Sequence, residues 1–236
     1  MDETLTAHIL REIPFDPDIP WLMRRLRIKE GSANQTELLR MIEEARPIAQ
    51  PKALFMVAYV TSRGEDWVEI AGIRFTSRVL RVNLDGLYRV FPYLATCGME
   101  LQDWADSFDD MLAGFWAEAV KEAALLCAVR AVFEDLEERY HPGETASMNP
   151  GSLADWPIQE QQPLFELFGG NARSIGVSLN ESMLMTPTKT VSGIRFATQT
   201  AFESCQLCPR EGCPGRRAIY DPELYDSRYC RQNGGR

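Results

Sequence analysis

The feature that most constrains the fold is a long amphipathic segment over residues 109–140, which predicts one continuous helix. Apolar side chains recur there at helical spacing, while four glutamates lie off the apolar stripe. The stripe consists of Leu112, Phe115, Trp116, Ala119, Val120, Ala123, Leu126, Cys127 and Phe133. His141-Pro142-Gly143 ends the pattern. At about 1.5 Å per residue such a helix is roughly 48 Å long, so we expect it to form the spine of the domain.

Segments typical of strands stand on both sides of this helix. They cover residues 52–62, 67–75 and 87–97 before the helix, and 175–179 and 191–198 after it. Pro92 removes an amide donor from the third of these segments, which predicts an edge strand or a bulge there. Because strands and helices do not alternate regularly, the sequence predicts the α+β class with a mostly antiparallel sheet.

The distribution of residue types divides the chain into three parts. Residues 1–50 are irregular and broken by prolines, apart from a helix over 35–45 for which Asn34 is the expected cap. Residues 51–203 contain the strands and the long helix, and we expect them to form the core domain. Residues 204–236 contain four of the six cysteines and predict a small metal-binding tail.

The charge of the chain excludes some classes of partner. A net charge of −9 argues against nucleic-acid and anionic-membrane binding, because both need a basic surface. The longest apolar run, residues 54–60, is far shorter than the ~20 residues of a membrane span. The first residues are acidic, unlike the start of a secretory signal. We therefore expect a cytoplasmic protein that binds neither nucleic acid nor membrane.

The cysteines near the C-terminus predict a metal centre. The candidate ligands are Cys205, Cys208, Cys213 and Cys230. Cytosolic cysteines rarely form disulfides, and two thiolates separated by two residues can reach one ion from a single turn. Structural zinc usually takes two such pairs and only one is present, so the spacing favours a [4Fe–4S] cluster, with zinc or unligated thiols as alternatives. Cys97 and Cys127 are interpreted as buried structural residues.

A series of motifs follows the long helix in a fixed order. They are Asn149-Pro-Gly-Ser-Leu-Ala-Asp-Trp-Pro157, a short helix over 159–168, Ile175-Gly-Val-Ser-Leu-Asn-Glu-Ser182, Met185-Thr-Pro187 and Thr190-Val-Ser-Gly193. The series resembles the activation domain of cobalamin-dependent methionine synthase, closely over 149–193 and more loosely over 52–148. The resemblance implies a twisted antiparallel sheet with flanking helices.

The resemblance also implies a function. The family binds S-adenosylmethionine and presents it to a reduced cobalamin for reductive methylation. A related group, the ATP-dependent reductive activators of corrinoid proteins, joins a similar domain to iron–sulfur centres, and stand-alone proteins of this type occur in anaerobes. We therefore interpret the chain as an iron–sulfur redox or reductive-activation partner of a corrinoid protein or methyltransferase. The alternative is a non-catalytic module that binds a corrinoid or a protein, with a tail folded by structural zinc or a cluster.

The family's ligand site maps onto residues of this chain. The implied ligand-binding residues are Glu122 (with Glu118 as its alternative), Asn149, Gly151, Ser152, Asp155, Glu181 and Ser182. Ser147 stands where the family has an arginine that holds the methionyl carboxylate, Ser152 stands where it has an aromatic residue, and Asn180 replaces a threonine. Without that clamp we expect S-adenosylmethionine to bind weakly or not at all, unless Arg173 or Arg195 supplies the cation. A corrinoid is a further candidate ligand.

Several of these residues also have purely structural interpretations. Gly151 can serve as a turn glycine, Asp155 as the cap of a helix that opens at Trp156, and Glu181-Ser182 as a capping turn. The ordered series of motifs therefore carries the inference, and no single residue does. The aromatic content of the tail, including Tyr225 and Tyr229, further predicts that it packs onto the body near the loop over 144–157.

Overall fold

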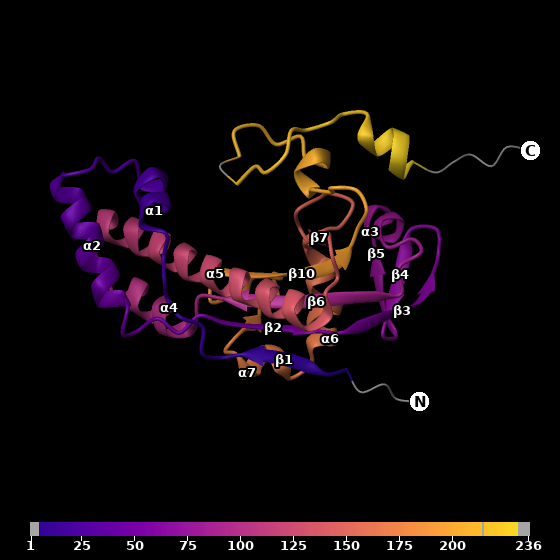
Figure 1. Cartoon of the computed structure of the whole chain (residues 1–236), viewed down its shortest axis with the longest axis horizontal. Coiled ribbons are helices and arrows are strands. Elements are labelled where there is room, and N and C mark those ends of the chain that lie inside the picture. Colours follow the sequence, from indigo (N-terminus) through magenta and orange to yellow (C-terminus); the bar gives the residue numbers. More distant parts are fainter. Residues whose placement is uncertain (1–4, 214, 231–236) are drawn as a thin grey trace, which may run out of the picture.

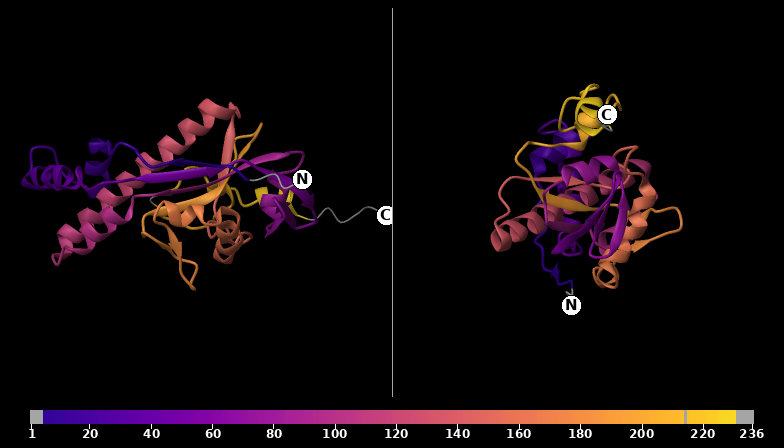
Figure 2. Two further views of the ribbon diagram at one scale, coloured as in Figure 1. Left: turned by 90° about the horizontal axis from the view of Figure 1, so that it is seen from below. Right: turned by 90° about the vertical axis from the view of Figure 1, so that its right-hand side faces the viewer.

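The computed structural model describes residues 5–213 and 215–230, and its fold belongs to the α+β class. A mostly antiparallel sheet carries helices on both faces, as Figures 1 and 2 show, which confirms the predicted class. Residues 1–4, 214 and 231–236, which belong to the predicted N-terminal segment and tail, lie outside the described part.

Within the described residues, eight strands form the main sheet. They are β1 (Ala7–Leu10), β2 (Lys52–Met56), β3 (Ala58–Arg63), β4 (Trp67–Ile70), β5 (Ile73–Thr76), β6 (Arg89–Thr96), β7 (Thr145–Met148) and β10 (Thr190–Ala197). Their order is β1-β2-β6-β3-β4-β5, with β10 paired to β6 and β7 paired to β10. A separate hairpin consists of β8 (Ser178–Leu179) and β9 (Met185–Thr186). β6 is therefore the central strand, and among the described strands β7 pairs with β10 alone.

Pro92 lies in the central strand β6, at a point where two predictions need correction. β6 pairs with β10 along one side and with β2 and β3 along the other, so of the two predicted alternatives, an edge strand or a bulge, the edge strand was wrong. Phe55 of β2 faces Tyr93, and Ala58 of β3 faces Val90, which places both strands in one register. The break between them lies opposite Phe91 and Pro92, and Pro92 has no amide hydrogen to donate. The predicted single strand over 52–62 is thus two strands.

The second predicted strand, residues 67–75, is a hairpin. β4 and β5 pair antiparallel, with Ile70 opposite Ile73. The two residues between them, Ala71 and Gly72, have positive φ values of 50° and 82°. Two consecutive left-handed residues are typical of the tight turns that match the twist of a hairpin. The prediction of one strand was wrong because an Ala-Gly pair is a weak turn signal in a β-rich segment.

Seven α-helices flank the sheet in the described residues. They are α1 (Ile19–Leu26), α2 (Ala33–Ala45), α3 (Arg78–Asn83), α4 (Met99–Asp106), α5 (Met111–Tyr140), α6 (Gln161–Phe168) and α7 (Asn171–Ser174). α5 confirms the predicted long helix, and it is capped by Asp110 and ended by a left-handed His141. The cap predicted for α2 was two residues too late: Ser32 is extended and its side chain accepts from the Gln35 amide, whereas Asn34 is already helical.

Each face of the sheet has its own hydrophobic core, because strand side chains alternate between faces. Ala53 and Phe55 of β2 pack with α1, α2, α4 and α5, whereas Leu54 and Met56 pack with α3, α6 and α7. We call these the α5 face and the α6 face. Three members of the predicted α5 stripe are exposed: Leu112, Phe115 and Leu126, the last at 43%. Leu112 and Phe115 lie in the first turns of α5, where the helix extends past the sheet and buries fewer of its side chains.

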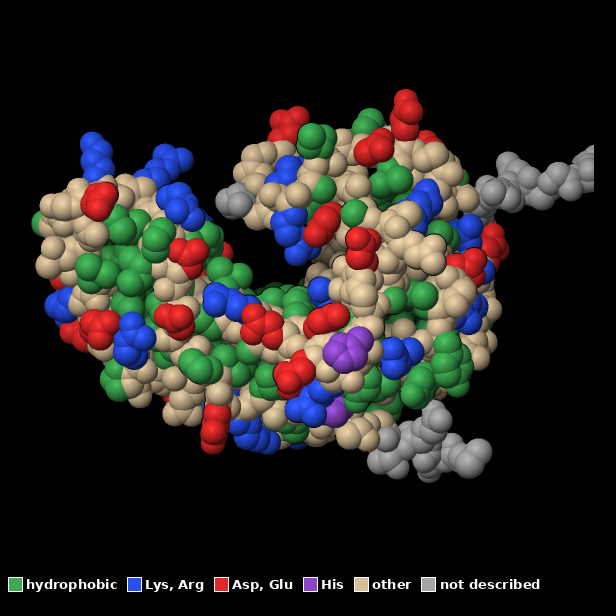
Figure 3. All heavy atoms as spheres, viewed as in Figure 1, with side chains coloured by type: hydrophobic (Ala, Val, Ile, Leu, Met, Phe, Trp, Pro, Cys, Tyr) green, Lys and Arg blue, Asp and Glu red, His purple; other side chains and the backbone are tan. Residues whose placement is uncertain are grey.

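The tail folds back onto the body, as the sequence predicted. Tyr229 is fully buried in the core of the α6 face, and Leu207, Cys208 and Leu224 pack against that core. Figure 3 shows a hollow between the tail and the end of the molecule that holds α1 and α2. Among the described helices none combines the length and the apolar character needed to cross a membrane.

Candidate functional site

A polar cluster occupies the α5 face where β6, β10 and β7 lie side by side. Arg195 of β10 stands directly opposite Ser147 of β7, and its Nη1 donates to the Ser147 hydroxyl at 3.1 Å. The same guanidinium lies 3.9 Å from the ring centroid of Phe133 in α5. Asn149, at the start of the loop after β7, donates from Nδ2 to the Tyr93 hydroxyl at 2.7 Å. We call Tyr93, Phe133, Ser147, Asn149 and Arg195 the Arg195 cluster.

Burial controls the ionisation of this cluster. It lowers the pKa of Arg195 from its ordinary value, and the negative charges of Glu137 and Glu203 oppose that shift. Burial also raises the pKa of Tyr93, so that the phenol stays neutral at physiological pH. At the edge of the cluster, Arg217 of the tail forms an ion pair with Glu203 at 2.9 Å. Arg195 is thus a half-buried cation with acidic residues close by.

Most of the hydrogen-bonding capacity of Arg195 is unused. Its bond to Ser147 is its one hydrogen bond within residues 5–213 and 215–230. A guanidinium has five N–H groups in a planar fork that matches a carboxylate. The cation–π contact with Phe133 orients the group without using those donors. The geometry therefore suits the binding of an anionic group from outside the chain.

Gly193 keeps the cluster compact, and we expect Gly193→Ala to disturb it. A methyl group there would lie 2.5 Å from both the Met148 carbonyl oxygen and Asn149 Nδ2, and 3.0 Å from the Tyr93 ring. The cost of such overpacking is about 1–3 kcal/mol in the free energy of unfolding, measured in urea. Gly114→Ala in α5 is the matched control, since a methyl there meets nothing within 4 Å. An unchanged stability in Gly193→Ala would contradict this view of the cluster.

The loop after β7 is stabilised by hydrogen bonds between its own residues. Gly151 has a φ of 83°, and its amide donates to the Trp156 carbonyl at 2.8 Å. The Ser152 hydroxyl donates to the Asn149 carbonyl at 2.5 Å. These contacts make Gly151 a turn glycine and Ser152 a bracing residue. Of the loop residues predicted to bind a ligand, Asn149 is the one that joins the Arg195 cluster.

Asp155 lies on the α6 face and has a structural role different from the one predicted. Its Oδ2 accepts from the Val79 amide at 2.9 Å and from the Ser77 hydroxyl, so it caps α3. The interpretation as a cap for a helix opening at Trp156 was wrong, because the carboxylate is directed at α3. Tyr225 of the tail lies 3.4 Å from its other oxygen. Asp155 therefore joins the loop, α3 and the tail.

The remaining predicted residues lie in other places. Glu181 lines a cavity of about 660 Å³ between α6, α7 and the β8–β9 hairpin, to which residues 144–157 contribute nothing. The Ser182 amide donates to Asn180 Oδ1 at 2.9 Å within that hairpin. Glu122 forms an ion pair with Arg25 of α1 at 3.5 Å. The structure does not gather the seven predicted residues into one site.

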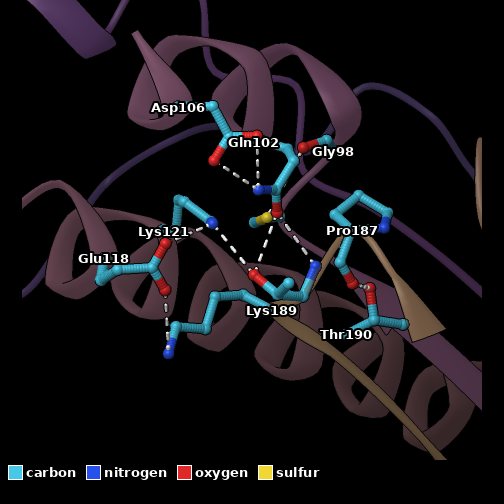
Figure 4. Close-up of polar contacts among 10 residues, drawn as sticks. Gly98, Gln102, Asp106, Glu118, Lys121, Pro187, Lys189 and Thr190 are labelled. Carbon is cyan, nitrogen blue, oxygen red and sulfur yellow. Dashed lines mark hydrogen bonds and ion pairs between the residues drawn. The ribbon is translucent and has the colours of Figure 1, made fainter. Parts of the chain in front are cut away.

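Glu118, the alternative to Glu122, belongs to a buried network between α4, α5 and the turn before β10 (Figure 4). Lys121 is fully buried and donates to Glu118 at 2.5 Å and to the Thr188 hydroxyl at 3.0 Å. Lys189 pairs with the other Glu118 oxygen at 3.4 Å, and Gln102 accepts from Thr188 at 3.0 Å. Since these groups bond to one another, the network fastens the turn onto the two helices.

The acidic residue of α5 that faces the Arg195 cluster is Glu137, which sequence reasoning missed. It follows Phe133 by four residues and therefore lies on the same side of the helix. Its charge acts on Arg195. Glu122 is eleven residues before Phe133, or roughly 16 Å along the helix axis. The i, i+4 spacing from an aromatic residue was the signal available in the sequence.

The tail cysteines do not form a metal-binding group in the described part of the chain. No three His, Cys, Asp or Glu side chains among residues 5–213 and 215–230 are arranged to hold a metal ion, and the cysteines there are free thiols. Cys230 is exposed, and its thiol donates to Asp226 at 3.2 Å. The Cys205 sulfur accepts from the Arg217 amide at 3.4 Å. The donor set as arranged does not fit a four-thiolate centre, so iron–sulfur and zinc stay predictions.

Arg216 organises the loop that carries these cysteines. Its guanidinium donates to the carbonyl oxygens of Cys205 and Cys208 at 3.2 Å, of Ala218 at 3.3 Å, and of Arg210. The two cysteines of the body are buried, in agreement with their structural interpretation. Burial raises the pKa of Cys97 to about 11, which keeps that thiol protonated.

Comparison with known proteins identifies the fold. No family model matches the sequence, and no curated protein matches it significantly. The structure is similar to the crystal structure of the MetH reactivation domain bound to AdoHcy, with a TM-score of 0.63. The similarity covers 86% of this chain and 82% of that chain at 15% sequence identity. The chain therefore has the fold of that reactivation domain.

Proposed function

We propose that the chain is an activation partner of a corrinoid-dependent methyl-transfer protein and binds a ligand of the AdoHcy or AdoMet type at the Arg195 cluster. The ligand class is supported by the shared fold with a reactivation domain whose structure was determined with AdoHcy bound. The observation that carries the proposal is the guanidinium of Arg195, which is half-buried, oriented by Phe133 and largely without acceptors in the described chain.

Arg195 compensates for the arginine that the family has at the position of Ser147. The two residues are direct cross-strand partners on the α5 face. Side chains in such pairs start about 4.5–5.5 Å apart, so a guanidinium on β10 reaches the space available to one on β7. Arg173, the other candidate, lines the cavity beside α6 and α7 on the other side of the sheet. A carboxylate bound at Arg195 would accept two parallel hydrogen bonds from the guanidinium.

Neighbouring groups suit the ammonium that accompanies such a carboxylate. Asn149 uses Nδ2 to donate to Tyr93 and to the Ser192 carbonyl, each at 2.7 Å. Its amide oxygen makes no hydrogen bond within the described residues and is available as an acceptor. Glu137 adds a negative charge on the helix side. The cluster therefore offers both charges that an amino-acid moiety requires.

The hollow beside the tail supports the second half of the proposal. It opens between the tail and the end formed by α1 and α2, so a partner has access to the centre of the molecule (Figure 3). In this scheme the corrinoid supplies the methyl-transfer chemistry. The chain itself binds and orients the small ligand. No step of the proposal depends on a metal bound to the tail.

The test is a calorimetric titration of the full chain with AdoHcy. We expect one site per chain with a Kd in the micromolar range, about 1–100 μM, since a charge-assisted fork contact anchors the ligand. Titration with adenosine, which lacks the amino-acid moiety, is the matched control and should show much weaker binding. Absence of heat with AdoHcy up to millimolar concentration would reject the proposed ligand class.

A further inference from the structure

A second cavity lies on the α6 face, across the sheet from the Arg195 cluster. It is an open cavity of about 660 Å³ bordered by α6, α7 and the β8–β9 hairpin. Figure 2 shows these elements in orange below the sheet in its left view. Charged side chains of both signs line it, from Glu166, Arg173 and Glu181. Phe165 and Met183 add apolar surface. Its size falls within the roughly 300–1,000 Å³ typical of small-molecule sites.

The charged residues at this cavity are exposed to solvent and have no partners in the described chain. Glu166, Arg173 and Glu181 make no ion pair and no side-chain hydrogen bond within residues 5–213 and 215–230. The network around Lys121 is different, because each of its charges is matched internally. Two carboxylates and one guanidinium around one space complement a ligand that carries both an ammonium and a carboxylate.

The walls of the cavity are fixed by the backbone. Asn180 Oδ1 accepts from the Ser182 and Leu184 amides at 2.9 and 3.0 Å, which closes the hairpin. Met183 is thereby held at a φ of 62°, a left-handed conformation that residues with a side chain rarely adopt. On the opposite wall a methyl at Gly169 or Gly170 would meet nothing within 4 Å, so that side stays open. Residues held in an unfavourable backbone conformation are concentrated at functional sites.

We propose that this cavity binds a free amino acid with an apolar side chain. The ammonium lies between Glu166 and Glu181, the carboxylate binds Arg173, and the side chain rests against Phe165 and Met183. The site is separate from the Arg195 cluster, and each can exist without the other. An amino acid bound here bridges α6 and the hairpin, and it stabilises the position of the hairpin relative to the sheet.

The test uses L-leucine as the probe, with amide NMR spectra of the full chain as the readout. We expect shifts confined to amides of residues 166–183 and a Kd on the order of 1 mM, as suits a ligand of this size in an open cavity. Isoamylamine, which lacks the carboxylate, and 4-methylpentanoate, which lacks the ammonium, should each bind about tenfold more weakly.

Variants separate the contributions of the two charges. Arg173→Gln should reduce leucine affinity to that of isoamylamine, and Glu181→Gln should weaken leucine and isoamylamine but not 4-methylpentanoate. Glu134→Gln on the exposed side of α5 is the matched control. Leucine shifts should persist in Arg195→Ala, so this proposal can fail while AdoHcy binding holds. Absence of shifts at roughly 20 mM leucine, shifts elsewhere, or equal affinity in Arg173→Gln would overturn the proposal.

Discussion

Replacing Arg195 with alanine is expected to weaken AdoHcy binding by about thirtyfold or more. Truncating one partner of a desolvated, hydrogen-bonded charge pair costs about 2–5 kcal/mol, and 1.4 kcal/mol corresponds to a factor of ten. Arg195 is half-buried, and burial already lowers its pKa, so water compensates poorly for a lost carboxylate contact. Calorimetric titration of the full-length variant measures the effect.

Two further variants identify the cause of that loss. Arg195→Lys should retain part of the affinity, because lysine keeps the charge but lacks the planar fork. Arg173→Ala should bind AdoHcy like the parent chain, because Arg173 lines the other cavity. Thermal unfolding of each variant shows whether it is folded. Equal losses in Arg195→Ala and Arg173→Ala would contradict the assignment of the carboxylate site.

Tyr229→Ala is expected to release the tail and to lower the free energy of unfolding by about 3–5 kcal/mol, as large core truncations do. The Tyr229 ring is fully buried among residues of the α6 face. Its hydroxyl donates to Asn83 Oδ1 at 3.0 Å, and its carbonyl accepts from Arg78 Nε at 3.0 Å. Alanine leaves a cavity and an unpaired Asn83 acceptor, so the tail loses its anchor.

Urea unfolding and limited trypsin digestion measure the two parts of this effect. In the parent chain, cleavage after Arg216 should be slow, because its guanidinium bonds to four carbonyl groups of the same loop. In Tyr229→Ala, cleavage there should become fast. Tyr220→Ala is the matched control, since that ring is 40% exposed. Equal stability and equal cleavage in the two variants would show that Tyr229 is not the anchor.

The elements that the sequence predicted well are those that local patterns encode. The periodicity over residues 109–140 corresponds to α5, and its ends are set by Asp110 and His141. The position of β6 was not predictable in this way. A proline excludes hydrogen bonding on one side of a strand only, and Pro92 coincides with a break between two strands on its β2–β3 side. Whether such a break exists depends on residues distant in sequence.

The candidate site was predicted in part, for a related physical reason. Motif order located the loop after β7 and the departure at Ser147, since both are local. The proposed compensation by Arg195 depends on the pairing of β7 with β10, which joins residues 48 positions apart. Asp155 likewise caps a helix 76 residues away. Cysteine spacing suggested a four-thiolate centre, but spacing does not determine whether Cys230 approaches the others.

Moving the arginine from β10 back to β7 tests whether Arg195 supplies the carboxylate contact from across the strand pair. The measurement is AdoHcy affinity in a double variant, Ser147→Arg with Arg195→Ser, compared with each single variant. We predict that Arg195→Ser alone loses binding and that the double variant recovers affinity to within about tenfold of the parent chain, because cross-strand partners on one face reach the same space. A folded double variant that stays unable to bind AdoHcy, or an Arg195→Ser variant that binds like the parent chain, would contradict the account.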